Sequence, residues 1–225
     1  MNYALDMDGP LCDLVKGIFI FYKIPEPSWD EIFYKINKWD GISLAINSWA
    51  SLKGDEHLSN LNESDMWREI SDIGGSEFWH KIPATSWMRS LLEAVEYKDR
   101  DVIIISTPTK GCGKTPEQAA KNVGDCIHGK LLWVNSNIPQ LIDRVNFARN
   151  KGSLAQPDRV LIDDGLHQIR NWRKSGGQAI LFPSPQTVKN YSINDVNNVL
   201  YELNKSKPNI QKIGSMFDDR IIENY

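Results

Sequence analysis

Short apolar runs alternate with helical patterns along most of the chain. Residues 3–5 form a brief apolar strand that ends at Asp6, and residues 102–107 form a continuous β-branched run, typical of a strand buried on both faces. Similar runs predict further strands at 142–147, 158–164 and 178–182. Because helical patterns separate these strands, we expect an α/β fold with a doubly wound parallel sheet.

Apolar positions at helical spacing predict the connecting helices. They cover residues 11–22, 87–97, 116–134, 166–174 and 194–203. Residues 115–118 combine an N-cap threonine, a proline in the first turn and a capping-box glutamine. Residues 28–31 also have the form of a capping box and predict a helix over residues 32–38.

The stretch from residue 15 to residue 85 lacks strand patterns. It consists of helical fragments, turns rich in glycine, serine and asparagine, and several tryptophans. We interpret it as a helical cap inserted into an α/β core that comprises residues 1–14 and 86–210. Residues 211–225 form a polar tail whose structure the pattern does not predict.

Composition narrows the class of protein. Apolar residues make up 41% of the chain, charged residues 24%, and the net charge is −3, so we expect a globular protein without general attraction to polymeric nucleic acid or to an acidic membrane. No apolar run approaches the roughly 20 residues of a spanning helix. Three cysteines without a CxxC pair, and no signal region, predict a reduced, cytoplasmic protein. The oligomeric state stays open, with a homodimer as one alternative.

The first strand delivers two aspartates to one place. Asp6 and Asp8 are two residues apart, so in an extended segment their carboxylates point the same way, and Gly9 then allows a sharp turn. A cation or a shared proton must relieve the repulsion between them. Oxygen ligands with open positions suit Mg²⁺, which also binds phosphate.

Other polar residues follow the predicted strands at their carboxyl ends. Ser106 and Thr107 end the second strand, Asp163 and Asp164 end the fourth, and Lys151 comes shortly before the fourth. Ligands of doubly wound sheets bind beyond the carboxyl ends of the strands. We therefore expect these acids, hydroxyls and lysine to meet in one crevice.

These residues occur in four ordered motifs, which resemble those of the haloacid dehalogenase-like (HAD) phosphohydrolases and, within them, the 5'(3')-deoxyribonucleotidases. The motifs are DMDGPLCD at 6–13, IIISTPTK at 103–110, Lys151 in ARNKGS, and VLIDD at 160–164. Leu181-Phe182-Pro183 and the segment from Asn171 to Gly177 also resemble the subgroup. The resemblance covers about half of the chain, and the cap resembles the family in position more than in sequence.

The resemblance implies a Mg²⁺-dependent phosphomonoesterase, a 5'-nucleotidase type of hydrolase, that acts on deoxyribonucleoside or ribonucleoside monophosphates. Asp6 would attack the phosphate and form an aspartyl-phosphate, and Asp8 would protonate the leaving oxygen. The phosphate would be bound by Ser106, Thr107, Lys110 and Lys151. The metal would be held by Asp6, the Asp8 backbone carbonyl and Asp164, with Asp163 orienting the last of these.

Some residues leave alternatives open. Phe78 and Trp79, at the return from the cap, are candidates for contacting a base, although such aromatic residues also fit a small core. Pro10 departs from the family pattern and removes an N–H near the phosphate. The further acid often found after the two aspartates is also missing. The four histidines have no spacing typical of metal ligands.

Three other functions are alternatives. Residues 110–115 resemble the end of a P-loop and would suggest a nucleotide kinase, but proline stands where its first glycine is needed and cannot supply the N–H that cradles phosphate. A phosphatase for another small phosphate ester, and a binding module on the same fold, are the remaining alternatives. Base and sugar preference, and 5' versus 3' phosphate, depend on cap geometry that the sequence does not give.

Overall fold

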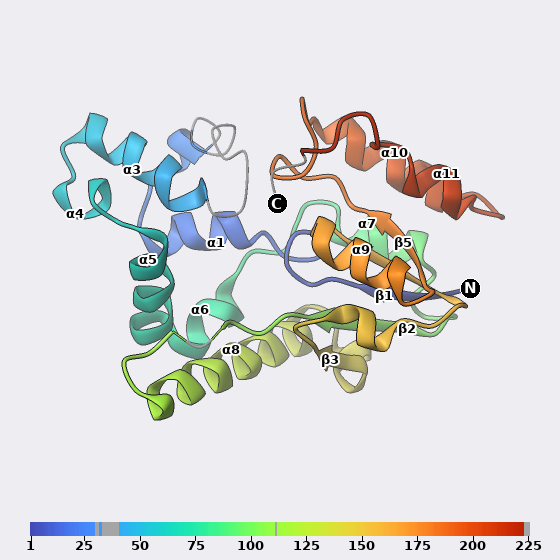
Figure 1. Cartoon of the computed structure of the whole chain (residues 1–225), viewed down its shortest axis with the longest axis horizontal. Helices are drawn as coiled ribbons and strands as arrows, with labels where there is room; N and C mark the ends of the chain where they lie inside the picture. Colours follow the sequence, from blue (N-terminus) through green and yellow to red (C-terminus); the bar gives the residue numbers. More distant parts are fainter. Residues whose placement is uncertain (30–31, 33–40, 111, 223–225) are drawn as a thin grey trace. The chain divides into compact units, whose positions relative to one another are not determined.

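The computed structural model describes residues 1–29, 32, 41–110 and 112–222, and the chain divides into two compact units (Figure 1). The first unit comprises residues 1–13, 84–107 and 134–225. The second comprises residues 14–83 and 108–133. Residues 108–133, which include most of the helix predicted at 116–134, therefore pack with the inserted segment. The sequence analysis placed them in the α/β core.

The first unit is built on a parallel sheet. Within the described residues, five strands pair in the order β3-β2-β1-β4-β5, and every pair is parallel. The strands are β1 (Asn2–Leu5), β2 (Val102–Ser106), β3 (Val145–Phe147), β4 (Arg159–Asp163) and β5 (Gln178–Leu181). With helices between the strands, this arrangement confirms the predicted α/β class.

The apolar runs explain why β1 and β4 lie in the middle of the sheet. All five residues of β4 are buried, as are Tyr3, Ala4 and Leu5 in β1. Strands covered by helices on both faces need apolar side chains at successive positions, not only at alternate ones. The continuous runs that predicted these strands are thus a consequence of their central position.

Helices and short 3₁₀ turns lie between the strands of the first unit and after its last strand. They are α7 (Met88–Ala94), η4 (Pro139–Arg144), η5 (Lys151–Leu154), α9 (Leu166–Lys174), α10 (Ile193–Leu203) and α11 (Ile210–Gly214). Helix α9 packs against β4 and β5. The predicted bounds of α9 are confirmed at both ends, and α10 begins with a hydrogen bond of 2.9 Å from Ser192 N to Asp195 Oδ2.

The second unit is helical in its described residues. Its elements are α1 (Leu14–Phe21), η1 (Glu26–Ser28), α3 (Ile42–Lys53), α4 (Glu56–Ser59), α5 (Glu63–Glu69), the π-helix η3 (Ile70–Gly74), α6 (Gly75–Lys81) and most of α8 (Pro116–Asn137). Its core is aromatic: the rings of Trp67 and Trp79 stack with an interplanar angle of 1°, and Phe78 meets both Phe21 and Trp79 edge to face.

Three local predictions differ from the structure. The strand predicted at 142–147 is shorter, because Pro139 opens a 3₁₀ helix that continues to Arg144. Thr115 caps α8 as predicted, but the Gln118 side chain donates to Asp72 and Asn122 and does not complete a capping box. The capping box at 28–31 and the helix at 32–38 fall largely on residues 30–31 and 33–40, which lie outside the described residues.

The tail beyond residue 208 packs onto the first unit. It forms α11 and then an antiparallel bridge between Val188 and Ile221. Among the described residues, no helix combines the length and apolar character needed to cross a membrane.

Candidate active site

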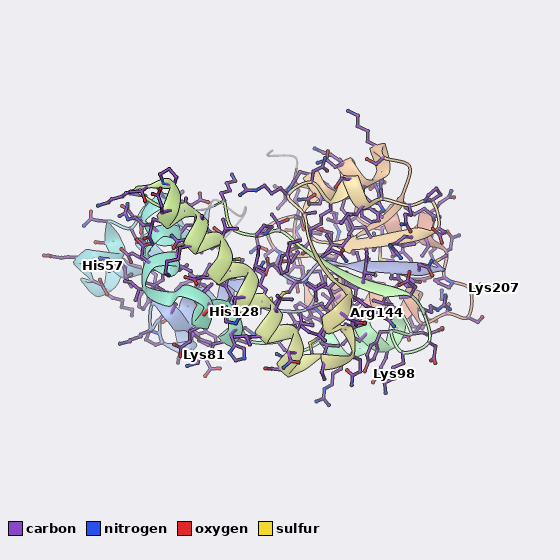
Figure 2. All side chains as sticks on the ribbon, turned by 90° about the horizontal axis from the view of Figure 1, so that it is seen from below. His57, Lys81, Lys98, His128, Arg144 and Lys207 are labelled. Atoms are coloured by element: carbon purple, nitrogen blue, oxygen red, sulfur yellow. The ribbon has the colours of Figure 1, made fainter. Side chains whose placement is uncertain are left out.

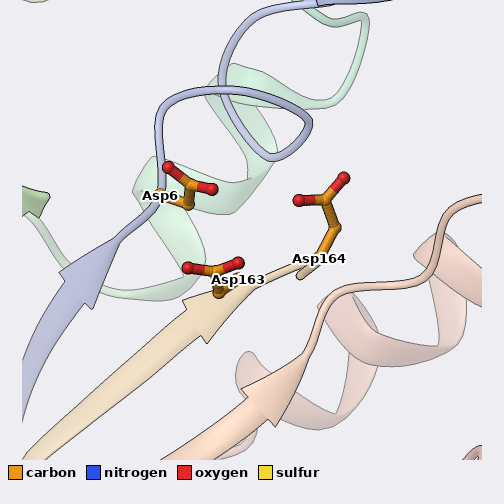
Figure 3. Close-up of side chains that lie close together, drawn as sticks. All are labelled: Asp6, Asp163 and Asp164. Carbon is orange, nitrogen blue, oxygen red and sulfur yellow. The ribbon is translucent and has the colours of Figure 1, made fainter. Parts of the chain in front are cut away.

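The carboxyl ends of β1 and β4 meet where the order of the strands reverses. The chain leaves β1 toward β2 on one side and later enters β4 on the other, and such a switch point is where doubly wound sheets bind ligands. The register pairs Leu5 with Ile162, and Asp6 N donates to Ile162 O at 2.9 Å. Asp6 and Asp163 therefore lie on neighbouring strand ends, with Asp164 beside them (Figure 3).

Asp6, Asp163 and Asp164 form a buried acid cluster. One carboxylate oxygen from each lies within 4.8 Å of the others, and none of the three residues is more than 7% exposed. Burial and then repulsion from Asp163 raise the pKa of Asp6 to about 7, against the lowering effect of Lys151. Burial, followed by repulsion from Asp6, also raises the pKa of Asp164 well above its ordinary value.

Lys151 supplies a buried positive charge to this cluster. It begins the 3₁₀ helix η5 and is 1% exposed, and its Nζ lies 2.6 Å from Asp6 Oδ1 and 2.7 Å from Asp163 Oδ2. Burial lowers the pKa of Lys151, but Asp163 and Asp6 together outweigh this effect and raise it above its ordinary value. The lysine thus stays charged between two carboxylates.

The turn after β1 brings the backbone close to the acid cluster. Gly9 has a φ of 92°, and a Cβ placed on it would lie 2.4 Å from Asp164 Oδ2. Glycine is needed here for both its conformation and its small size. Asp8, at the start of this turn, is partly exposed, and its Oδ1 lies 3.5 Å from Cys12 Sγ.

The backbone carbonyl of Pro10 stabilises this turn by accepting two hydrogen bonds. Its oxygen accepts hydrogen bonds of 3.1 Å from both Thr85 Oγ1 and Trp87 Nε1. The residue that departs from the family pattern therefore anchors the turn to the segment where the chain returns to the first unit. Its missing N–H leaves the carbonyl contacts intact.

The two predicted hydroxyls lie at the end of β2, on the other side of β1. Ser106 is fully buried, and its backbone carbonyl accepts from Ala148 N at 3.1 Å. Thr107 is partly exposed, and its Oγ1 donates to Ala148 O at 3.2 Å. Both residues therefore contact the segment that leads to Lys151.

Gln168 is a polar residue of this region that the sequence analysis missed. It lies in the first turn of α9, is 3% exposed, and its Oε1 accepts from Lys151 N at 3.0 Å. Its amide nitrogen donates to Arg149 O at 2.9 Å. No spacing rule singles out a glutamine in a helix, so only the folded contacts identify it.

The acid cluster fits a hard divalent cation. Asp164 Oδ2 is buried and accepts no hydrogen bond from the residues that the structure describes. Burial of an unpaired carboxylate oxygen is costly, whereas Mg²⁺ prefers oxygen donors of this kind. Asp6 and Asp164 would hold the ion, while Asp163 accepts from Lys151 and from Gly165 N at 2.7 Å and is fixed by both.

Histidine does not contribute to this group. Asp6, Asp163 and Asp164 are the one set of metal-ligating side chains that the described residues bring together. His57 lies in α4 and contacts Glu69, and His128 lies in α8; both are labelled in Figure 2.

Three predicted site residues belong to the second unit. Phe78 and Trp79 are 7% and 4% exposed and form part of its aromatic core, and Lys110 is exposed in the segment before α8. Burial among aromatic rings agrees with the alternative that both serve as core residues. Contact of these three residues with a substrate stays a prediction.

The segment that resembles a P-loop lies between β2 and α8, and its Gly111 is outside the described residues. Gly113 packs closely, since a Cβ on it would lie 2.6 Å from Ala119 N, and Lys114 is exposed. The first four residues of VLIDD lie in β4, whose last residue, Asp163, is ion-paired to Lys151.

No model of a known protein family and no curated protein sequence matches this chain. Solved structures do resemble it. An L-2-haloacid dehalogenase from Xanthobacter autotrophicus aligns with 99% of this chain and 89% of its own, at 11% identity and a TM-score of 0.42. A HAD hydrolase, family IA, variant 3, from Entamoeba histolytica aligns with 89% of this chain and 88% of its own, at 13% identity and a TM-score of 0.37.

A hydrolase from Pseudomonas syringae is similar in the same way. It aligns with 88% of this chain and 90% of its own, at 14% identity and a TM-score of 0.39. With TM-scores below 0.5, these similarities do not carry the functional proposal. The proposal rests on the residues of this chain.

Proposed function

We propose that the protein is a Mg²⁺-dependent phosphomonoesterase of the HAD type, which hydrolyses small phosphate esters through an aspartyl-phosphate on Asp6. The observation that carries this proposal is the buried group at the switch point: three carboxylates, one lysine ion-paired to two of them, and one carboxylate oxygen left unpaired. A structural ion pair would not need the third acid. A metal-assisted reaction at phosphorus would.

Asp6 would act as the nucleophile. Its Oδ1 accepts from Met7 N at 2.7 Å and from Lys151 Nζ at 2.6 Å, so these contacts orient the carboxylate and leave Oδ2 for attack. A bond forms between Oδ2 and phosphorus as the bond from phosphorus to the ester oxygen breaks. This covalent step divides one difficult displacement into two easier ones.

Asp8 would carry the proton in both steps. It gives a proton to the leaving ester oxygen, and it later takes one from the water that attacks phosphorus and releases Asp6. Its place at the start of the Gly9 turn, partly exposed, suits a group that must meet substrate and water in turn. Cys12 Sγ is in contact with its Oδ1.

Charge on the phosphoryl group would be balanced by Lys151 and by the cation. When bound, Mg²⁺ would supply positive charge to the phosphoryl oxygens. Lys151 is held by Asp163 and by Asp6, so its ammonium is already in place before substrate arrives. Ser106, at the end of the neighbouring strand, would donate to another phosphoryl oxygen, and Thr107 would do so by exchanging its hydrogen bond to Ala148 O.

Nucleoside monophosphates, and deoxyribonucleoside monophosphates in particular, are the substrates we propose. The similarity of the four motifs to those of 5'(3')-deoxyribonucleotidases supports this choice. The inserted helical unit begins directly after the Gly9 turn, an arrangement that suits small substrates better than polymers. Long DNA and large phosphoproteins should therefore react much more slowly than mononucleotides.

The test is phosphate release from a panel of deoxyribonucleoside and ribonucleoside monophosphates and base-free esters, with and without Mg²⁺. We expect Mg²⁺-dependent release that Asp6→Asn abolishes. Asp158→Asn is the matched control, because Asp158 is an exposed carboxylate at the opposite end of the same sheet, bonded to Asn2. No release from any ester, or full activity of Asp6→Asn, would contradict the proposal.

The same assay separates the proposal from two alternatives. Lys114→Ala should keep its phosphatase activity, whereas a P-loop kinase would lose phosphoryl transfer from ATP with this change. L-2-chloropropionate is included because several similar structures are dehalogenases. Halide release from it, without phosphate release from any ester, would favour dehalogenation.

A further inference from the structure

The amide side chain of Gln168 joins segments that carry three of the four motifs. We propose that Gln168 is a positioning residue, which holds Lys151 in the place where its ammonium reaches Asp6; this inference rests on the proposed function. The glutamine lies on α9, which follows Asp163 and Asp164. Its partners are Lys151 at the start of η5, Arg149 just before η5, and Thr107 just after β2.

The position of Gln168 would ordinarily make it part of a helix cap. Gly165 is the N-cap of α9, and a glutamine three residues later commonly accepts from the N-cap N–H. Here the Gly165 N–H donates to Asp163 Oδ1 at 2.7 Å. Because an acid of the cluster occupies that N–H, the glutamine side chain is available for other partners.

Gln168 uses both ends of its amide on the turn that carries Lys151. Its Oε1 accepts from Lys151 N at 3.0 Å, and its Nε2 donates to Arg149 O at 2.9 Å. Two backbone groups on residues two apart are thus held by one planar side chain. The turn is held further by Asn150, whose Oδ1 accepts from Gly152 N at 3.1 Å.

The two ends of Lys151 are consequently fixed by different elements. Gln168 on α9 holds its backbone, while Asp6 and Asp163 at the strand ends hold its ammonium. A long, flexible side chain can serve as a fixed charge only if both ends are anchored. Displacement of the turn would move the ammonium relative to the nucleophile.

The same amide also contacts the predicted phosphate-binding hydroxyl. Gln168 Nε2 lies 3.5 Å from Thr107 Oγ1, which in turn donates to Ala148 O at 3.2 Å. This is the longest of the glutamine's contacts. Through this contact, the side chain of Gln168 is hydrogen-bonded to both Thr107 and Lys151.

A neutral amide suits this place better than a carboxylate. Gln168 is 3% exposed and lies beside a cluster that already contains three buried acids. Glutamate would add a fourth negative charge and could not donate to Arg149 O, so this carbonyl would lose its hydrogen bond from residue 168. Leucine could neither accept from Lys151 N nor donate to Arg149 O.

The first test is steady-state kinetics of Gln168→Leu on the most active substrate of the panel. We expect kcat to fall about 10- to 100-fold, because small displacements of a catalytic group are costly, while KM changes by less than about twofold. The matched control is Arg173→Met, on the same helix, which also loses two hydrogen bonds to backbone carbonyls, those of Ala179 and Gly214. It should retain the activity of the wild type.

A double variant distinguishes positioning from a general structural role. If Gln168 acts through Lys151, adding Gln168→Leu to Lys151→Met should lower kcat by less than about twofold further, since the shared effect is already lost. A full additional loss in the Lys151→Met background would overturn the inference. So would unchanged kcat in Gln168→Leu.

A crystal structure of the variant gives a readout that is independent of activity. We expect the contact of 2.6 Å between Lys151 Nζ and Asp6 Oδ1 to be broken in Gln168→Leu, and its retention would overturn the inference. If Gln168→Leu does not fold, Gln168→Glu serves in both experiments. If the wild type hydrolyses no ester, the proposed function fails, and the structure of the variant still decides the role of Gln168.

Discussion

The two units each bury a lysine, and they do so in different ways. Lys151 in the first unit is 1% exposed and lies between the carboxylates of Asp6 and Asp163. Lys130 in the second unit is 0% exposed, and its Nζ lies 4.9 Å from the centre of the Trp79 ring. Lys151 is ion-paired to two carboxylates, whereas Lys130 contacts the face of the Trp79 ring, which is itself stacked on Trp67.

The two carboxylates around Lys151 favour this lysine for the proposed chemistry. An ion pair buried at a strand end costs free energy that an apolar core would not, and such groups are concentrated at functional sites. A lysine over a tryptophan ring lets its long apolar stem pack while the ring faces its charge. We therefore expect changes at Lys151 to affect both stability and activity, and changes at Lys130 to affect mainly stability.

The largest expected effect follows from removing the charge of Lys151. In Lys151→Met without Mg²⁺, two buried carboxylates lose their partner, so we expect the free energy of unfolding to fall by about 3–5 kcal/mol. Urea denaturation at neutral pH measures this change. An equally stable variant would show that the acids do not depend on the lysine.

A smaller change in the free energy of unfolding should come from adding Mg²⁺, which supplies a second positive charge to the acid cluster. Mg²⁺ at about 100 times its dissociation constant should stabilise the wild type by about 2.7 kcal/mol, because it binds only the folded site. Asp164→Asn should lose this stabilisation, since Asp164 Oδ2 is the unpaired oxygen. Thermal unfolding with and without Mg²⁺ measures both. Equal stabilisation of the two proteins would place the ion elsewhere.

Gly9→Ala tests the close approach of the turn to the acid cluster. We expect a loss of about 1–3 kcal/mol from the backbone conformation and the contact of the new Cβ with Asp164. Gly176→Ala is a matched control, because Gly176 has a similar φ of 89° but no neighbour within 4 Å of a new Cβ. Only Gly9→Ala should also weaken the stabilisation by Mg²⁺. The same response in both variants would contradict the role of the contact.

The smallest change in the free energy of unfolding is expected for a variant of Lys130 in the second unit. Lys130→Met keeps a long side chain but removes the ammonium over Trp79, and we expect the loss of this contact to lower the free energy of unfolding by about 0.5–2 kcal/mol. Denaturation under the conditions used for Lys151→Met allows direct comparison of the two lysines. A loss as large as that of Lys151→Met would remove the distinction between them.

Much of the fold could be predicted because its patterns are local. The apolar runs of β1, β2 and β4 predicted central strands, and helical periodicity with the glycines after residue 175 predicted α9 with its bounds. The strand before Lys151 was predicted too long, because residues 142–144 lie in a 3₁₀ helix that begins at Pro139. Periodicity does not distinguish short apolar turns from short strands.

The acid cluster could be predicted because its three residues follow strands that were themselves predicted. Parallel strands end at one edge of a sheet, so Asp6, Asp163 and Asp164 were expected together, and the structure brings them together. Gln168 could not be found, because its role depends on the contact of α9 with η5 and not on any spacing. The packing of residues 108–133 with the inserted segment likewise depends on long-range contacts such as that of Gln118 with Asp72.

The most direct test of the proposed chemistry is detection of the covalent intermediate. The protein would be mixed with Mg²⁺ and the best nucleoside monophosphate, quenched in acid during turnover, digested, and analysed by mass spectrometry. The account predicts one added phosphoryl group on the peptide that contains Asp6, and none in Asp6→Asn. A phosphoryl group on another residue, or turnover of the ester without any phosphorylated peptide, would contradict it.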